Sequence, residues 1–380
     1  MSSSLPLWLT LTLATAVAAD SAVLTDWGAA PAPAPAKAPS VPLPPSQGGA
    51  TRAKAVGFLL GAQHGDGGWG SGDHGSNGQG AASDVATTAF TVLALQRDAA
   101  GSGRHLTAMK RGALFVVEAV EQAPAGPQLR TPEGTQIQRK LGPLVDTHLA
   151  GLMLGEVVGT FDQATDLRVR RALDIVTSKI ASAQRADGSF DGNAWAPVLS
   201  TALASQGLAR AVQVGAKVDK DVLDKSDTYQ NNVGKGDTSQ SAGINLYAVA
   251  SGFANAAKMA TRTGSAAPTA SAQAEAIEVS ADAVQAIRSD DGSFVAGFGS
   301  LGGEEMLSYM MISDGMAAKG GAEWDAWNRK ISGILGSAQD AQGSWQGHHC
   351  ITSQVFSTAG GVMTLAAGDM ANWRRLHPTG

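Results

Sequence analysis

Apolar side chains recur along much of the chain at the three- and four-residue spacing of an amphipathic helix. Val169, Leu173 and Val176 follow this spacing, and a second run of the same kind begins at Trp324. Residues 85–95 (VATTAFTVLAL) differ, because they are apolar or small on nearly every side. A helix without a polar face is buried on both sides, whereas an amphipathic helix buries one face. The pattern therefore predicts an outer layer of amphipathic helices around an inner layer of apolar helices.

A short motif of the form Q-x-x-D-G-x-aromatic lies between the two kinds of predicted helix. Its clearest copies are residues 63–69 and 184–190. A third copy, residues 288–294, begins with Arg, and a fourth, residues 339–345, has Gln in place of Asp. The motif residues are Gln63, Asp66, Trp69, Gln184, Asp187, Phe190, Asp291, Phe294, Gln339 and Trp345.

Each part of the motif has a structural explanation. Asp caps backbone N–H groups at the start of a helix, and Gly supplies the positive φ that a tight turn needs. The aromatic ring is expected to pack over the turn, where the Gln amide reaches neighbouring carbonyl groups. We therefore expect the motif to join adjacent repeats, and it identifies a fold rather than a catalytic site.

The spacing of the motif predicts six repeats. The first two gaps between copies are about twice the third, so each of them contains one degenerate unit. These units run over residues 109–158 and 222–259. Four clear and two degenerate copies predict an all-α fold, an α6/α6 toroid of six helical hairpins in two concentric rings, over residues 51–372.

The repeats resemble the QW repeats of squalene and triterpene cyclases, which protein prenyltransferase β-subunits and complement-like thioester domains share in looser form. The resemblance covers about residues 51–372 and implies the toroid fold. Fold does not fix function, so each family's chemistry needs its own residues. Cyclases start with the acid of a D-x-D-D string, but the nearest string here, residues 288–291, begins with Arg and lies in a repeat turn. Three Tyr and nine Phe are also few for a cavity that stabilises carbocations.

The other two family chemistries also lack their residues. Prenyltransferases hold zinc with an Asp-x-Cys pair and a His, and residues 304–306 (EEM) occupy the place of that pair. Met306 is a poor zinc ligand, and His348 and His349 lie a few residues before the expected His. The thioester string C-G-E-Q is absent, because Ile-Thr-Ser follows Cys350. The sequence departs from the catalytic motif of each family, so we expect a protein without cyclase, zinc-prenyltransferase or thioester chemistry.

Three acids share one position in the repeats. Asp84, Asp146 and Glu304 each stand at the predicted start of an inner helix, and these helix starts point to one end of the ring. The sequence therefore predicts a rim at that end. The candidate rim residues are Asp84, Asp146, His148, Trp195, Glu304, Tyr309, His348, His349 and Cys350.

Two interpretations of the rim remain open. The acids cap their helices and complement the helix dipoles, or they form a site for a divalent metal, a cationic ligand or acid–base chemistry. His148 and residues 348–350 supply metal-ligand types from different repeats, so neither a metal ligand set nor a cofactor is assigned. Cys350 beside His349 suggests a nucleophile, and a small core residue is the alternative. The glycine-rich residues 65–80 are either a lid, a partner-binding loop or filler.

The N-terminus is typical of an exported protein. Residues 5–19 are apolar, uncharged and end in small residues, which predicts a signal peptide over residues 1–19 cleaved near Ala18. An uncleaved anchor is the alternative, because residues 1–4 contain no Lys or Arg. Residues 20–50 form a Pro/Ala-rich linker and residues 373–380 a short tail. These features predict a periplasmic, cell-envelope or extracellular location.

Composition narrows the choice of partners. The net charge is −5 and no basic block with interleaved aromatics occurs, so we expect no nucleic-acid partner. The mature chain has no second apolar stretch long enough to span a bilayer. Two hypotheses follow. The first is an exported ring protein that binds a small molecule or cell-envelope partner through its central cavity or rim. The second is an enzyme of the same fold, terpene-cyclase-like, prenyltransferase-like or polysaccharide-active, that uses rim carboxylates and His.

Overall fold

The computed structural model describes residues 48–376, except 74, 191–194, 236–243 and 289–301. The described residues contain 13 α-helices and no β-strand, which confirms the predicted all-α class. The predicted signal peptide, most of the linker, and Asp291 and Phe294 of the third motif lie outside the described residues.

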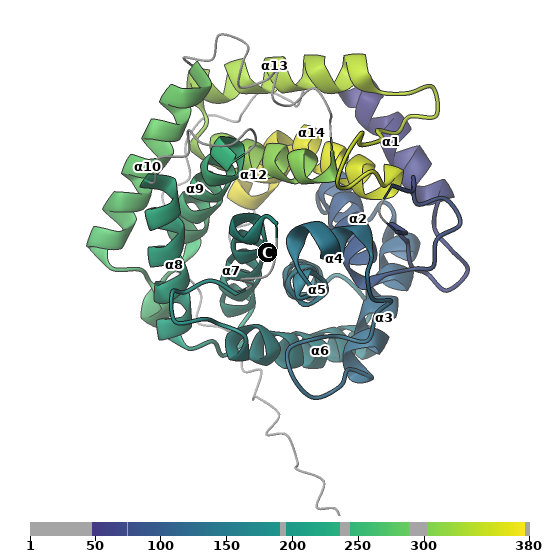
Figure 1. Ribbon diagram of the computed structural model, residues 1–380, viewed down its shortest axis with the longest axis horizontal. Coiled ribbons are helices and arrows are strands. Elements are labelled where there is room, and N and C mark those ends of the chain that lie inside the picture. The colour runs from purple at the N-terminus through teal and green to yellow at the C-terminus, as the bar shows by residue number, and fades with distance from the viewer. Residues whose placement is uncertain (1–47, 74, 191–194, 236–243, 289–301, 377–380) are drawn as a thin grey trace, which may run out of the picture.

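Six apolar helices form an inner layer (Figure 1). They are α2 (Val85–Ala99), α5 (Val145–Val157), α7 (Pro197–Gln213), α9 (Ile244–Thr261), α12 (Gly303–Lys319) and α14 (Gln354–Leu376). Each helix contacts the next in this order, and α14 contacts α2, so the order of contacts is closed. All but one residue of α2 are buried, as its uniformly apolar pattern predicts. Helix α14 runs on to Leu376, so part of the predicted tail is helical.

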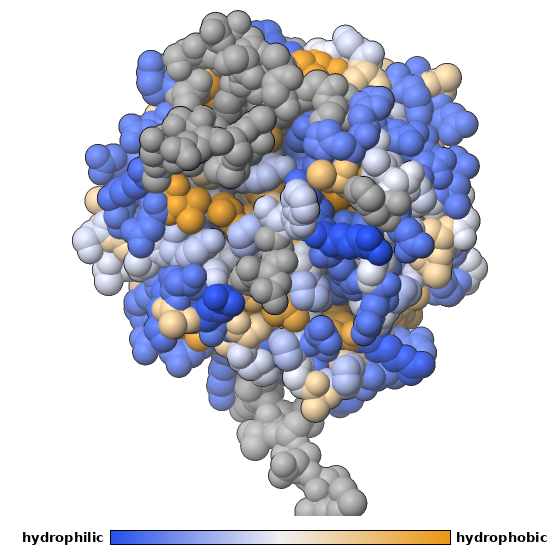
Figure 2. All heavy atoms as spheres, in the orientation of Figure 1, coloured by the Kyte–Doolittle hydropathy of each residue, from blue (hydrophilic) through white to orange (hydrophobic). Residues whose placement is uncertain are grey.

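Six amphipathic helices form an outer layer. They are α1 (Gly49–Gly61), α3 (Leu106–Glu121), α6 (Gln163–Ser182), α8 (Lys220–Lys235), α10 (Ala270–Arg288) and α13 (Gly321–Ala338). Each packs on an inner helix: α3 on α2, α6 on α5, α8 on α7, α10 on α9, α13 on α12 and α1 on α14. The face of the molecule in Figure 2 is mainly hydrophilic over these outer helices. A short helix, α4 (Gln136–Leu141), lies near the centre of the view.

In the three motif copies that begin with Gln, this side chain joins the turn to the next outer helix. Its amide nitrogen donates to a carbonyl oxygen inside the turn and to a second carbonyl oxygen outside the turn. The outside contacts are Gln63 to Ala108, Gln184 to Val222 and Gln339 to Thr51, at 2.9, 2.8 and 2.8 Å. These bonds confirm that the amide reaches neighbouring carbonyl groups. The last of them connects the fourth motif copy to α1, where Arg52 also pairs with Asp369 of α14 at 2.6 Å.

The Asp of the motif stabilises the turn rather than a helix start, so the predicted capping role was wrong. Asp66 and Asp187 each accept a hydrogen bond from the backbone N–H two residues further on, at 2.9 and 3.0 Å. In the fourth copy Asp340 accepts from Ser344 N at 2.8 Å instead. The acid has moved two positions earlier, which explains why Gln342 is tolerated.

The aromatic residues of the described motifs are buried at equivalent places. The indole N–H groups of Trp69 and Trp345 donate to carbonyl oxygens in the preceding outer helix, at 2.8 and 2.9 Å. Phe190 occupies the same position without a polar group. The backbone N–H of each of the three donates to a threonine hydroxyl of the following inner helix, at distances of 2.9 to 3.3 Å. The motif therefore fixes an outer helix to an inner one as well.

Candidate functional site

The centre of one end of the molecule is built from three segments far apart in sequence. Helix α4 has a capping box, in which the Thr135 hydroxyl and the Gln138 side chain satisfy the first backbone N–H groups. The buried Gln136 amide donates to the carbonyl oxygen of Ser71 at 2.5 Å and accepts from the backbone N–H of Thr352 at 2.5 Å. Helix α4 thus holds the glycine-rich loop against the segment before α14. The loop is part of this end of the molecule and is not filler.

Asp84 and Asp146 serve the fold at this end. Asp84 is the N-cap of α2 and accepts from the backbone N–H of Thr87 at 2.7 Å. Asp146 lies in the first turn of α5 but accepts from Ala86 N of α2 at 3.0 Å and from the Gln138 amide of α4 at 2.8 Å. Burial raises the pKa of both carboxyl groups, and nearby Asp84 helps to raise that of Asp146 to about 7. Asp146 therefore joins α2, α5 and α4.

Two candidate residues lie in helix packing away from the other rim candidates. His148 is fully buried between α5 and α7, with Nδ1 3.0 Å from the Ser200 hydroxyl. Burial lowers the pKa of its imidazole to about 3, so the ring is neutral. Tyr309 is buried on α12, with its ring centroid 6.4 Å from that of Trp327 on α13. The structure places neither residue beside Glu304.

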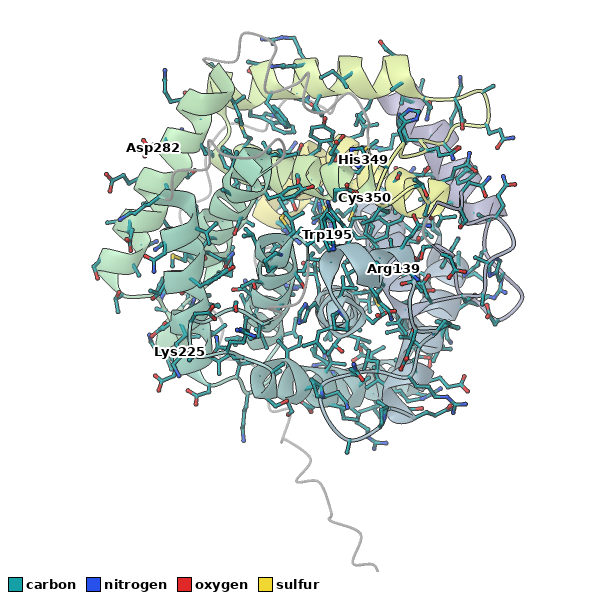
Figure 3. The ribbon with its side chains drawn as sticks, viewed as in Figure 1. Arg139, Trp195, Lys225, Asp282, His349 and Cys350 are labelled. Atoms are coloured by element: carbon teal, nitrogen blue, oxygen red, sulfur yellow. The ribbon has the colours of Figure 1, made fainter. Side chains whose placement is uncertain are left out.

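Three other candidates do come together. Glu304, in the first turn of α12, is fully buried, and its Oε1 lies 3.4 Å from His349 Nδ1. One ligand atom each from Glu304, His349 and Cys350 lie within 4.8 Å of one another. Figure 3 shows His349 and Cys350 near the centre of the molecule, close to Trp195. His348 is exposed and belongs to no such cluster among the described residues.

The backbone at Cys350 is strained. Its φ of 54° lies in the left-handed region, which non-glycine residues rarely adopt. Such strain persists where the surrounding structure fixes it, and it collects at functional sites. Burial raises the pKa of the Cys350 thiol; the Glu304 charge raises it further, and Lys140 partly opposes both effects. The thiol is therefore protonated at neutral pH, which disfavours a nucleophilic role for Cys350 in this state.

Sequence reasoning missed two residues of this cluster. Lys140, in the last turn of α4, places its Nζ 3.4 Å from Cys350 Sγ and 3.7 Å from Glu304 Oε1. Tyr247, in the first turn of α9, has its ring centroid 5.7 Å from that ammonium nitrogen. The signal that could have found Lys140 is weak, since the six residues of α4 lie within a degenerate repeat and are too few to show a periodic pattern.

A comparison with known proteins finds no matching family model, curated protein or solved structure. No helix within the described part of the chain combines the length and the apolar character needed to cross a bilayer.

Proposed function

We propose that this protein is an exported α/α toroid of six helical hairpins, similar to the QW-repeat proteins, that binds a ligand at one mouth of its ring. The closed order of contacts among the inner helices supports the toroid, as does the bond from Gln339 to Thr51 between the last and first repeats. The apolar residues 5–19 and the Pro/Ala-rich segment that follows them support export.

The ligand in this proposal is a divalent metal ion, and the convergence of Glu304, His349 and Cys350 carries it. A carboxylate oxygen, an imidazole nitrogen and a sulfur together favour zinc or a similar borderline ion over magnesium or calcium. Three protein ligands leave a position for an exogenous group, as in metal sites that bind small molecules. Glu305 lies 3.8 Å from His349 Nε2, where a carboxylate orients a metal-bound imidazole.

The enzymatic alternative receives less support from the acids at this end. Asp84 accepts a hydrogen bond from a backbone N–H group, and Asp146 accepts one from a backbone N–H group and one from the Gln138 amide. Both carboxyl groups therefore stabilise the fold. A pair of carboxylates that hydrolyses a glycosidic bond must instead face the substrate from both sides. Binding rather than hydrolysis is therefore the function that this arrangement favours.

Metal titration tests the proposal. We expect calorimetry with zinc to show one ion per chain, and cobalt(II) to give the charge-transfer absorption of a thiolate bond. Glu304→Gln, His349→Ala and Cys350→Ser should each weaken binding by at least about tenfold, because each removes a ligand. His348→Ala is the matched control, since it removes an adjacent exposed imidazole. Absence of binding by the wild type, or binding that survives all three substitutions, would reject the metal site.

A further inference from the structure

The ammonium group of Lys140 lies in a cage of aromatic and acidic groups. Its Nζ is 5.7 Å from the ring centroid of Tyr247 and 6.0 Å from that of Trp195. A cation within about 6 Å of a ring centroid is attracted by the negative face of the ring. The fully buried Glu304 supplies the compensating charge at 3.7 Å. The cage residues come from four parts of the chain: α4, the segment just before α7, the first turn of α9 and the first turn of α12.

Trp195 is the exposed wall of the cage. The residue is 81% exposed, the highest fraction among the large hydrophobic residues that the structure describes as exposed. Because the Trp195 side chain stays in water, it contributes little to the free energy of folding. Trp is among the residues that are enriched at binding hot spots. Its position does not depend on the lysine side chain, because Trp195 N and Ala196 N both donate to the backbone oxygen of Lys140, at 3.1 and 3.2 Å.

We propose that Trp195, Tyr247 and Glu304 form a binding site for the alkylammonium group of a small molecule, and that Lys140 fills this site as an internal occupant. A protonated amine on an alkyl chain matches the cage in charge and size, as the lysine side chain itself shows. The ligand's ammonium group takes the place of Nζ, and the side chain of Lys140 moves out. The inference does not rest on the metal proposal. The two share only Glu304, which either binds the metal ion or faces the ammonium group, and the cage uses neither His349 nor Cys350.

An external ammonium group can bind only while the Lys140 side chain is out of the cage. Its apparent affinity is therefore its intrinsic affinity multiplied by the fraction of molecules in which the cage is empty. Truncation of Lys140 should therefore reveal the site. Lys140→Ala removes the chain beyond Cβ, which n-propylammonium replaces atom for atom, and it keeps the backbone bonds to Trp195 and Ala196. Lys140→Met is the matched control, because its neutral side chain still fills the cage.

The experiment is a calorimetric titration of n-propylammonium chloride in the presence of EDTA, which removes metal from the comparison. We expect Lys140→Ala to bind on the order of tenfold more tightly than the wild type or Lys140→Met. The neutral analogue 1-propanol should not bind. Adding Trp195→Ala or Tyr247→Ala to Lys140→Ala should abolish binding, whereas adding His349→Ala should not.

A second measurement uses the unmodified protein, in case the Ala variant is poorly folded. Tetramethylammonium should release Lys140 and increase its rate of reductive methylation, measured by mass spectrometry, while the exposed Lys225 reacts at an unchanged rate. Equal binding of 1-propanol and n-propylammonium, or an unchanged methylation rate at Lys140, would overturn the cage. Loss of the metal site through His349→Ala, which leaves Glu304 in place, would leave these results unaffected.

Discussion

At the scale of single residues, the hydrogen bonds of Asp146 matter more than its place in the repeat. Its carboxyl group receives one bond from α2 and one from α4, so it connects the inner layer to the short helix at the mouth. Burial and the neighbouring Asp84 raise its pKa from 3.8 to about 7. The folded protein therefore retains a proton on this group at pH values where the unfolded chain has lost it.

This proton makes the stability depend on pH. A raised pKa contributes stability that is fully present below about pH 4 and is lost as the pH rises through about 7. Asp146→Asn cannot ionise, so its free energy of unfolding relative to the wild type should rise over this range, by at most about 4 kcal/mol. Chemical denaturation at several pH values measures the difference. A difference that stays constant from pH 4 to 8 would show that Asp146 does not titrate in this range.

Helix geometry explains which rim candidates the sequence placed correctly. Glu304, His349 and Cys350 were expected at one end and do lie together. His148 follows Asp146 by two residues, and two residues turn an α-helix by about 200°, so the two side chains point apart. Tyr309 follows Glu304 by five residues, or about 140°, and faces an outer helix for the same reason. A shared repeat position predicts a shared end, but the side chain's direction depends on the phase within the helix.

At the scale of elements, the motif turns depend on glycine for two separate reasons. Gly188 has a φ of 90°, and a Cβ there would lie 2.2 Å from the carbonyl oxygen of Lys225 in α8. Gly67 and Gly343 have the same φ within a degree, and a Cβ at either would lie 2.8 Å from the backbone of α3 or α1. The turn thus needs both an unusual backbone conformation and close approach to the next outer helix. The sequence predicted the unusual backbone conformation, because tight turns favour glycine. It did not predict the close approach, which depends on where the next outer helix lies.

A pair of substitutions separates these two requirements. Gly188→Ala should lower the free energy of unfolding by about 3 kcal/mol, from left-handed strain together with the clash against Lys225. Gly159→Ala should cost only about 1 kcal/mol, because its φ is 78° but its Cβ would meet no atom within 4 Å. Urea denaturation measures both variants. Equal losses would mean that close packing of the turn against α8 contributes nothing.

At the scale of the whole molecule, the repeats explain what could be predicted and what could not. Alternation of amphipathic and apolar helices predicted two layers, because each layer leaves a periodic pattern in the sequence. Helix α4 and the glycine-rich loop leave none, and their places depend on bonds such as those of Gln136 across three distant segments. The surroundings of Glu304 and Cys350 were therefore only partly predictable, because Lys140, which contacts both, lies on α4.

The contact between α1 and α14 bears on whether the chain must begin with α1 in order to fold. Arg52 of α1 pairs with Asp369 of α14, and Gln339 donates to Thr51, so the junction between these helices resembles those inside the chain. Two turns of helix, about 11 Å, separate Asp369 from Leu376. Gly48 lies beside the Leu365 side chain, and the helix rises about 17 Å from Leu365 to Leu376, so a flexible linker of several residues joins residue 376 to residue 48.

We therefore expect a circular permutant to fold. Joining residue 376 to residue 48 and opening the surface turn between Gly159 and Thr160 changes no buried contact among residues 48–376 that the structure describes, apart from the turn itself. The permutant should keep the helical circular dichroism of the parent and melt within about 8 °C of it, as expected for a loss of 1–2 kcal/mol in a large domain. A permutant that is soluble but lacks cooperative melting would show that the first hairpin must be made first. If it folds, the six hairpins form a cycle with no obligatory starting point, and any surface turn between hairpins becomes a place to insert a reporter domain.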